Sequence, residues 1–205
     1  MSREDVEAEV RERLAKADVE GALACLLNGF GSEIYGLLVG LHRDPNEADE
    51  AFSSFAEKVW RGLPGFRWES SLRTWLYVVA RSASQSHRRA RRRAARELPL
   101  SAVSQLSAIA LEVRSDTRSY LGSEARSGIA KLRAELSEDD QLLLVLRVDR
   151  GLEFLDIARI FLGQDASPSE VQRESARLRK RLQIVKQRIV DRARRSGLIG
   201  KKSRR

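Results

Sequence analysis

Apolar residues recur every three or four positions along most of the chain, and β-branched runs are short, so the pattern predicts helices throughout. Residues 4–27 are expected to form one or two helices broken near Gly21, and residues 32–41 another. Asp44 and Pro45 match an N-cap followed by proline at the first helical position. The helix that they begin is expected to end at the following Gly-Leu-Pro-Gly segment and to bury one face, formed by Ala48, Ala51, Phe52, Phe55 and Val59.

The next helix is predicted to begin after Ser70 and Ser71 and to continue into a tract of arginines. Its apolar positions are Leu72, Trp75, Leu76, Val79 and Ala83. Residues 98–119 differ in character, because Pro99, several serines and weak periodicity are typical of a linker.

Helical periodicity resumes near Tyr120. The segment Ser137–Asp140 fits a capping box, and the helix that it begins is expected to end at Gly151. Residues 152–162 form the next predicted amphipathic helix, which ends at Gly163.

The clearest helix start is Ser167-Pro-Ser-Glu170, with serine as N-cap, proline at the first helical position and glutamate at the third. One apolar stripe then runs along a long basic helix, at Val171, Ser175, Leu178, Leu182, Val185 and Ile189. We expect this stripe to pack on its own domain, and a dimeric coiled coil is the alternative.

These elements predict an all-α protein with two small helical domains joined by a flexible linker, the second domain containing a helix-turn-helix. The expected boundaries are residues 1–96 for the first domain, 97–119 for the linker, 120–197 for the second domain and 198–205 for a basic tail.

Charge along the 205 residues falls into four blocks. Residues 1–60 carry 6 Lys and Arg against 13 Asp and Glu, and residues 97–170 carry 8 against 13. Between and after them, residues 61–96 carry 10 against 1, and residues 171–205 carry 14 against 2. Two separate basic segments indicate two separate contacts with a polyanion, and solvated arginine-rich helix faces without a ligand are the alternative.

Composition excludes several kinds of functional site. A single cysteine, Cys25, excludes an intramolecular disulfide and a cysteine-based zinc site. The two histidines, His42 and His87, lie far apart in the sequence, so we expect no metal site, and no cofactor is expected. The acidic N-terminus lacks the basic and apolar segments of a signal peptide, and uninterrupted apolar runs fall far short of the ~20 residues of a membrane helix. We expect a cytoplasmic protein without membrane insertion.

Residues 152–182 have the layout of a helix-turn-helix. The second helix presents polar and basic residues in its first outward turns, where a recognition helix hydrogen-bonds base edges, and further basic residues that suit phosphates. Earlier in the chain, Trp68, Trp75 and Tyr77 lie just before or among arginines, a combination suited to unstacked bases. Trp75 is expected in the core, whereas Trp68 adjoins a loop.

Two segments carry a resemblance to a known family. Residues 44–93 read DPNEADEAFSSFAEKVWRGLPGFRWESSLRTWLYVVARSASQSHRRARRR, and residues 136–182 begin LSEDDQLLLVLRVDRGLEFLDIARIF and end RKRL. The first resembles region 2 of the sigma-70 family of bacterial transcription initiation factors, and the second resembles region 4. Their order, with a linker between them, is similar to that of the extracytoplasmic-function (ECF) group.

The resemblance implies three contact sets and no catalytic residue. Core RNA polymerase would be bound by Asp49, Glu50, Ser53, Ser54 and Glu57. The −10 element of promoter DNA would be opened and bound by Arg67, Trp68, Arg73, Arg81, Ser84, Gln85, His87, Arg88 and Arg89. The −35 duplex would be read by Gln172, Arg173, Ala176, Arg177, Arg179 and Lys180. Such a factor often has a dedicated inhibitor, an anti-sigma factor.

Three departures accompany the resemblance, one of which is a connection from Gly163 to Val171 that is longer than the family leads us to expect. Ser53-Ser54 stands where the family often has Gln-Glu. Glu174 lies on the recognition helix, where an acid repels phosphate unless it reads a cytosine amino group.

Two other function classes account less well for the sequence. A stand-alone helix-turn-helix regulator, dimeric through the long C-terminal helix, would bind duplex DNA without polymerase but leaves the tryptophan- and arginine-rich block unexplained. An enzyme acting on nucleic acid is not supported, since no Gly-rich phosphate loop is present. His42 is expected on a surface loop at a helix start, and His87 is expected to be exposed or to contact phosphate.

Overall fold

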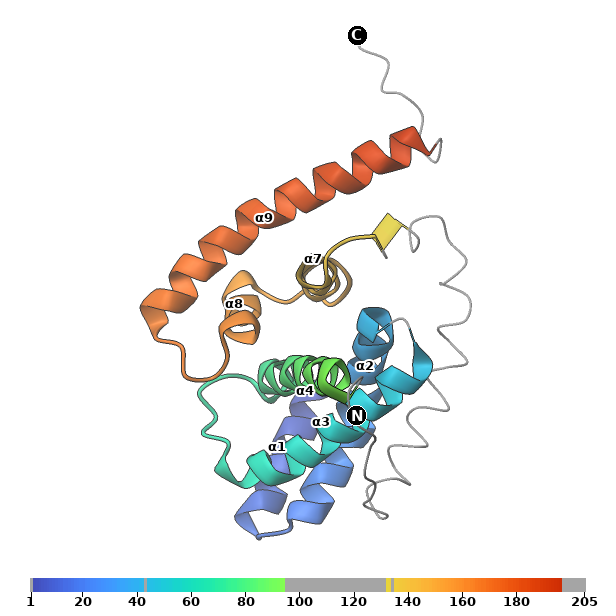
Figure 1. The fold of residues 1–205 in the computed structure, drawn as a ribbon. Helices are drawn as coiled ribbons and strands as arrows, with labels where there is room; N and C mark the ends of the chain where they lie inside the picture. The colour runs from blue at the N-terminus through green and yellow to red at the C-terminus, as the bar shows by residue number, and fades with distance from the viewer. Residues whose placement is uncertain (1, 43, 95–131, 134, 197–205) are drawn as a thin grey trace. The chain divides into compact units, whose positions relative to one another are not determined.

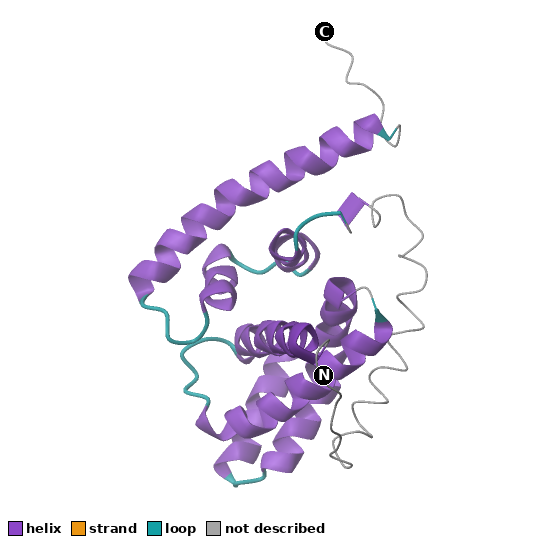
Figure 2. Cartoon of the chain, viewed as in Figure 1, coloured by secondary structure: helices purple, strands orange, loops and turns teal. Residues whose placement is uncertain are grey.

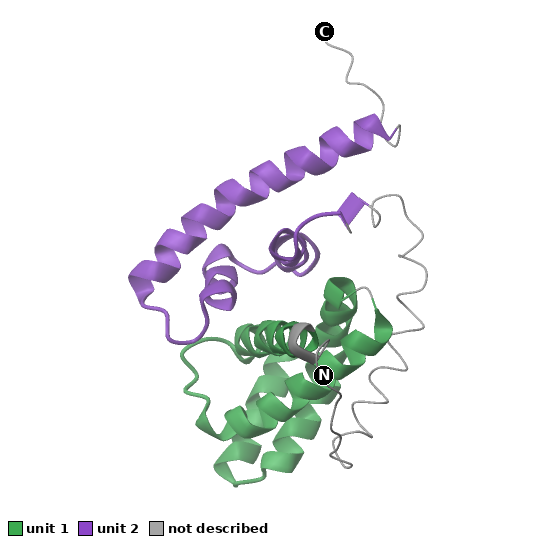
Figure 3. Ribbon diagram, in the orientation of Figure 1, with its two compact units in different colours: residues 1–119 green, residues 120–205 purple. Residues whose placement is uncertain are grey.

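The computed structural model describes residues 2–42, 44–94, 132, 133 and 135–196, and this part of the chain is helical without strands (Figure 1, Figure 2). The predicted all-α class is therefore confirmed. The chain divides into two compact units, residues 1–119 and 120–205 (Figure 3). The predicted linker and basic tail lie outside the described residues, as does most of the helix expected from Tyr120.

The first unit is a four-helix assembly around one apolar core. Helices α1 (Arg3–Ala15), α2 (Val19–His42), α3 (Pro45–Gly62) and α4 (Leu72–Ala94) follow one another, with a 3₁₀ turn at Leu63–Gly65. Helix α2 contacts the three other helices, and α3 also packs along α4. The largest fully buried side chains include Phe30, Tyr35, Phe52, Phe55 and Tyr77.

Several local predictions hold in this unit. Asp44 caps α3 through its side chain, which accepts a hydrogen bond from the Asn46 N–H at 2.8 Å, and Pro45 occupies the first turn. The expected apolar face of α3 is buried. Trp75 is 3% exposed, in the core as expected.

The predicted break near Gly21 is displaced by a few residues, and the prediction of a separate helix over residues 32–41 is wrong. The break lies instead at residues 16–18, and α2 continues through Gly21 and the later glycines. Asp18 explains the shifted start, because its carboxylate accepts a hydrogen bond from the Gly21 N–H at 2.8 Å in the first turn. Packing explains the continuity, since tertiary contacts override a weak helix propensity.

Helix α2 is long and apolar enough, by length and composition, to cross a membrane. Its most apolar window has a mean hydropathy of 1.5, and 61% of that window is buried inside the fold. Contacts with α1, α3 and α4 account for this apolar character. The sequence expectation, based on uninterrupted apolar runs, did not single out this helix.

A close approach of α1 makes Gly29 a sensitive position in α2. A Cβ atom at Gly29 would lie 2.7 Å from Cγ2 of Val6, whereas one at Gly40 would meet no atom within 4 Å. We expect Gly29→Ala to lower the free energy of unfolding of the first unit by about 1–3 kcal/mol, because the branched Val6 must move. Gly40→Ala is expected to raise it by up to about 1 kcal/mol through helix propensity.

Urea unfolding followed by tryptophan fluorescence checks this pair, because Trp60, Trp68 and Trp75 are the chain's three tryptophans and all lie in the first unit. Equal effects of the two substitutions would contradict the close approach.

The second unit contains α7 (Glu138–Leu144), a π-helical turn at Val145–Asp149, α8 (Phe154–Leu162) and α9 (Pro168–Arg195). The Ser167 capping box is formed, with the Ser167 N–H donating to Glu170 at 2.8 Å. At α7, Ser137 Oγ accepts from the Asp140 N–H at 3.3 Å. Gly163 caps the end of α8 with φ +96°, in the left-handed region that favours glycine.

The apolar stripe of α9 packs inside this unit. Its buried members are Val171, Ser175, Leu178, Leu182 and Val185, and Ile189 is half-buried. Helix α9 contacts both α7 and α8. The expected packing of the stripe on its own domain is therefore confirmed.

Candidate nucleic-acid interface

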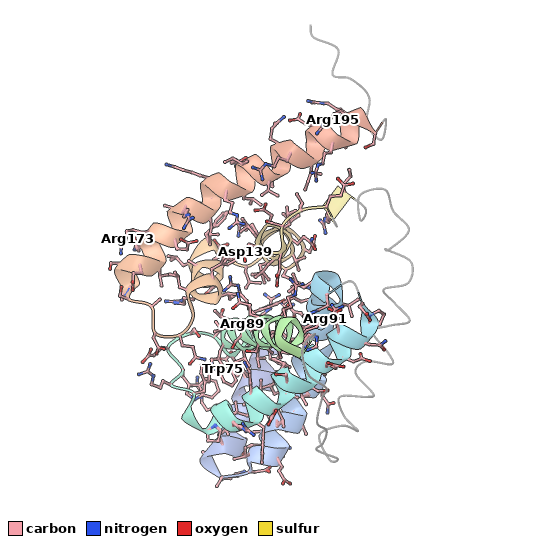
Figure 4. All side chains as sticks on the ribbon, in the orientation of Figure 1. Trp75, Arg89, Arg91, Asp139, Arg173 and Arg195 are labelled. Carbon is pink, nitrogen blue, oxygen red and sulfur yellow. The ribbon has the colours of Figure 1, made fainter. Side chains whose placement is uncertain are left out.

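The first turns of α9 present a polar and basic surface that is free of the apolar stripe. All six residues predicted to face DNA there are exposed: Gln172, Arg173, Ala176, Arg177, Arg179 and Lys180. Figure 4 shows Arg173 at the N-terminal end of α9 and Arg195 at the opposite end. Helix α8, a short connection and α9 together have the order of a helix-turn-helix.

Glu174 does not stand on this exposed face. Its side chain is 17% exposed and forms an ion pair with Arg177 at 3.6 Å. The carboxylate is therefore largely withdrawn from solvent and partly neutralised, which reduces the repulsion that it would exert on phosphate.

Contacts with α7 and α8 hold α9 within its unit, and one of them uses Arg179 of the exposed face. The guanidinium groups of Arg147 and Arg179 lie 4.9 and 5.3 Å from the ring centroid of Phe154 on α8. On α7, the Asp140 carboxylate accepts a hydrogen bond from Arg181 Nε at 2.6 Å, and Asp140 is 5% exposed. Helix α9 is thus tied to both preceding helices.

The predicted −10 residues occupy α4 and the loop before it, but they differ in accessibility. Arg67 and Arg89 are exposed. A second group is half-buried: Trp68, Arg73, Arg81, Gln85, His87 and Arg88. Ser84 is 1% exposed and lies 2.9 Å from His42 Nε2, so its hydroxyl does not reach the surface.

Trp68 has an unusual backbone and a covered ring. Its φ is +58°, in the left-handed region that bulky residues rarely adopt. The ring centroid lies 4.8 Å from that of Phe66, and the guanidinium of Arg11 lies 4.2 Å above the indole. No pattern along the chain predicts the Arg11 contact, because it joins α1 to a loop more than fifty residues away.

Arg73 is held by an ion-pair cluster under the start of α4. Its guanidinium binds the Glu33 carboxylate, which also accepts hydrogen bonds from Tyr77 Oη at 2.5 Å and Arg3 Nη2 at 3.3 Å. Burial opposes ionisation of Glu33, but the bonds from Arg73 and Tyr77 outweigh it, so the pKa of this carboxyl lies below its ordinary value of 4.5. Sequence reasoning did not identify Glu33, which lies on α2 far from the arginines.

We expect Glu33→Gln to destabilise the first unit by about 1.5–3 kcal/mol at neutral pH, since bonds to a charged group are lost. A lowered carboxyl pKa contributes stability above the unfolded-state pKa, and this contribution disappears as pH falls through the folded-state value. The difference between wild type and variant should therefore shrink below pH 4.5. Tryptophan-detected urea unfolding across this range measures it, with the exposed-loop variant Glu69→Gln as control. A pH-independent difference would contradict the role of the charge.

The predicted polymerase-binding residues share α3. Glu50 and Glu57 have side chains that are 72% and 45% exposed, and Glu57 pairs with Arg61 at 2.6 Å. Ser53 is exposed and Ser54 half-buried, whereas Asp49 accepts a hydrogen bond from the buried Tyr35 hydroxyl at 2.7 Å. Trp60, 43% exposed at the end of this helix, was not among the predicted residues.

The expectations for the two histidines need correction. His42 is the last residue of α2 and is 6% exposed, not on a surface loop, and the His87 side chain is 12% exposed. Their ring centroids lie 5.4 Å apart, although 45 positions separate them in the sequence. The expectation that these histidines are too distant to share a site is therefore wrong.

Two comparisons with known proteins bear on the resemblance of the chain to sigma factors. Residues 26–94 match the sigma-70 region 2 family. The chain is also similar to the RNA polymerase sigma-H factor of Pseudomonas aeruginosa, with 29% identity over 167 residues that cover 78% of this chain and 84% of that protein.

Proposed function

We propose that the chain is an RNA polymerase sigma factor of the sigma-70 family and that it directs core RNA polymerase to promoters by two separate DNA contacts, as the ECF group does. The main support for DNA reading by the second unit is the polar and basic face at the start of α9. All six residues that the resemblance assigns to the −35 element are exposed on it. A helix with this face fits the major groove, where Arg and Gln side chains reach base edges and flanking cations reach phosphates.

The first unit would supply the polymerase contact and the −10 contact. The acidic side chains of α3, above all Glu50 and Glu57, suit a basic partner surface on core polymerase. Among the proposed −10 residues, Arg67 and Arg89 are the exposed ones and so offer the most accessible charges for phosphate. The half-buried members, including Arg73 and Trp68, would mainly hold this surface in shape.

The proposed role requires binding energy and no catalytic residue. The protein would act in the cytoplasm, where polymerase and promoter DNA are found, and an anti-sigma factor is a further partner that the family resemblance predicts. A stand-alone regulator is not favoured, because the region 2 match covers the arginine- and tryptophan-rich block that such a regulator leaves unexplained.

The test mixes the purified protein with bacterial core RNA polymerase, follows complex formation by size exclusion, and then scores run-off transcription from a promoter library. We expect a stoichiometric complex that initiates on a subset of promoters, with DNA binding that weakens steeply between about 50 and 200 mM salt. Absence of a complex, together with tight duplex binding by the protein alone, would overturn the proposal in favour of a stand-alone regulator.

Charge reversal on α3 tests the polymerase contact. Glu57→Lys is expected to weaken the complex with core polymerase by roughly tenfold, since a rim charge pair becomes repulsive. Glu12→Lys is a matched control, because Glu12 also pairs with a cation four positions on, Lys16, at 2.6 Å, but lies on α1. Equal loss of affinity in both variants would argue against α3 as the docking helix.

A further inference from the structure

A cluster of buried nitrogen and oxygen atoms joins three helices at the end of α2. It consists of His42, the last residue of α2, Glu47 in the first turn of α3, and His87 on α4. One ligand-type atom from each residue lies within 4.8 Å of the other two. The His42 side chain is fully buried, and those of His87 and Glu47 are 12% and 16% exposed.

Both histidines direct a nitrogen without a hydrogen-bond partner into this cluster. His42 Nδ1 and His87 Nε2 are buried without a partner at hydrogen-bond geometry, and the contact of His42 Nδ1 with Glu47 Oε2 is long, at 3.5 Å. Buried polar atoms are nearly always satisfied in folded proteins, so two such nitrogens beside one carboxylate point to a ligand. A metal ion that accepts both lone pairs would satisfy them.

The outer nitrogen of His42 has a hydrogen-bond partner, as metal-bound histidines usually do, and that of His87 lies near a carboxylate. His42 Nε2 lies 2.9 Å from Ser84 Oγ, and His87 Nδ1 lies 3.5 Å from a Glu50 carboxylate oxygen. A proton on each outer nitrogen leaves the inner nitrogen free to coordinate, and a carboxylate behind the ring raises its basicity. Ser84, which the sequence suggested as a DNA contact, would have this supporting role.

We propose that His42 Nδ1, His87 Nε2 and a Glu47 carboxylate oxygen form a binding site for one divalent transition-metal ion, with Zn²⁺ as the probe. Two ligands at about 2.1 Å on a tetrahedral zinc lie about 3.4 Å apart. The distance between His42 Nδ1 and Glu47 Oε2 is 3.5 Å, so these two atoms already have the required separation. The ligand atom of His87 lies within 4.8 Å of the other two, so its side chain must move closer to complete the set.

The charged side chains around the cluster determine how tightly it would bind a metal ion. The guanidinium of Arg88 lies near His42 and adds a positive charge beside the cluster. The same Arg88 charge repels a cation, while Glu47 and Glu50 attract it. The second Glu47 oxygen pairs with Arg91, which orients the carboxylate. We expect micromolar rather than tighter affinity.

The ligand set also predicts selectivity. Imidazole nitrogens suit Zn²⁺, Cu²⁺ and Ni²⁺, whereas Mg²⁺ and Ca²⁺ require mostly oxygen ligands. Mg²⁺ at the same concentration is therefore expected to leave the protein unchanged. Zinc binding is measured without polymerase or DNA, so its failure and the failure of the proposed function are distinguishable, although His87 and Glu50 are also among the expected DNA and polymerase contacts.

The test uses the full chain without a histidine tag, freed of metal with a chelator and titrated with zinc chloride by calorimetry. We expect one equivalent to bind with micromolar affinity and to raise the urea midpoint of the first unit, read by tryptophan fluorescence. Because the chain contains only two histidines, nitrogen NMR of the imidazoles shows directly whether both rings change on binding. Millimolar or unsaturable binding, or binding without a change in either ring, would overturn the proposal.

Substitutions locate the site. Glu47→Gln and His87→Gln are each expected to weaken zinc affinity by about tenfold or more. Glu57→Gln is a matched control, since it removes another arginine-paired carboxylate from α3, and Cys25→Ala removes the chain's one thiol; both should keep wild-type affinity. Unchanged affinity in Glu47→Gln and His87→Gln, or loss of affinity in Cys25→Ala, would overturn the site.

Discussion

Replacing Arg173 by alanine is expected to lower initiation at promoters with an intact −35 element roughly tenfold to a hundredfold, while leaving the complex with core polymerase intact. Arg173 is exposed in the first outward turn of α9, where a side chain can reach a base edge in the major groove. A bidentate arginine–guanine contact is worth about 1–3 kcal/mol of discrimination. The variant should therefore also tolerate a changed base pair at one position of the element.

Lys186→Ala is the matched control for this result. Lys186 is also an exposed cation on α9, but it lies 13 positions further along the helix, about 20 Å away at 1.5 Å per residue. That distance exceeds the ~12 Å width of the major groove, so a helix that enters the groove by its first turns does not bring Lys186 to the same bases. Run-off transcription on matched promoters with and without the −35 sequence separates the two variants. A comparable loss with Lys186→Ala would show that only general charge matters.

The sequence predicts helix starts and exposed helix faces well, because both depend on residues that are close together along the chain. The starts of α3 and α9 follow from Asp44-Pro45 and Ser167-Pro168, because a capping side chain and its partner lie within three residues of each other. The exposed face of α9 follows equally from one buried stripe, since the position of that stripe determines which residues point outward.

Helix continuity and side-chain burial depend on residues that are far apart along the chain, so local sequence patterns do not predict them. The continuity of α2 depends on its packing among α1, α3 and α4, while the glycines within it locally suggest a break. The burial of His42, Ser84 and His87 depends on how α2, α3 and α4 pack, and no spacing along the chain encodes it. For the same reason, the predicted −10 residues divided into exposed and half-buried members only once α4 was packed.

The largest change in the free energy of unfolding is expected from breaking the ion pair between Asp140 on α7 and Arg181 on α9. Asp140 is 5% exposed, its carboxylate accepts from Arg181 Nε at 2.6 Å, and Arg188 lies 3.7 Å away. Breaking a buried ion pair by removing one partner costs about 3–5 kcal/mol. Because the Arg181 side chain keeps 31% exposure, part of that cost is relieved by water, and we expect Asp140→Ala to destabilise the second unit by about 2–4 kcal/mol.

The neighbouring carboxylate supplies the control. Asp139 is 43% exposed and lies 3.7 Å from Arg181, so Asp139→Ala is expected to cost less than about 1 kcal/mol. All tryptophans lie in the first unit, so Asp140→Ala should shift the urea midpoint of far-UV circular dichroism while the tryptophan midpoint stays unchanged. Unfolding of the second unit would also remove −35-dependent initiation, whereas Arg173→Ala removes it without a loss of stability. Equal effects of Asp139→Ala and Asp140→Ala would show that burial of the Asp140 carboxylate does not determine how α9 is held.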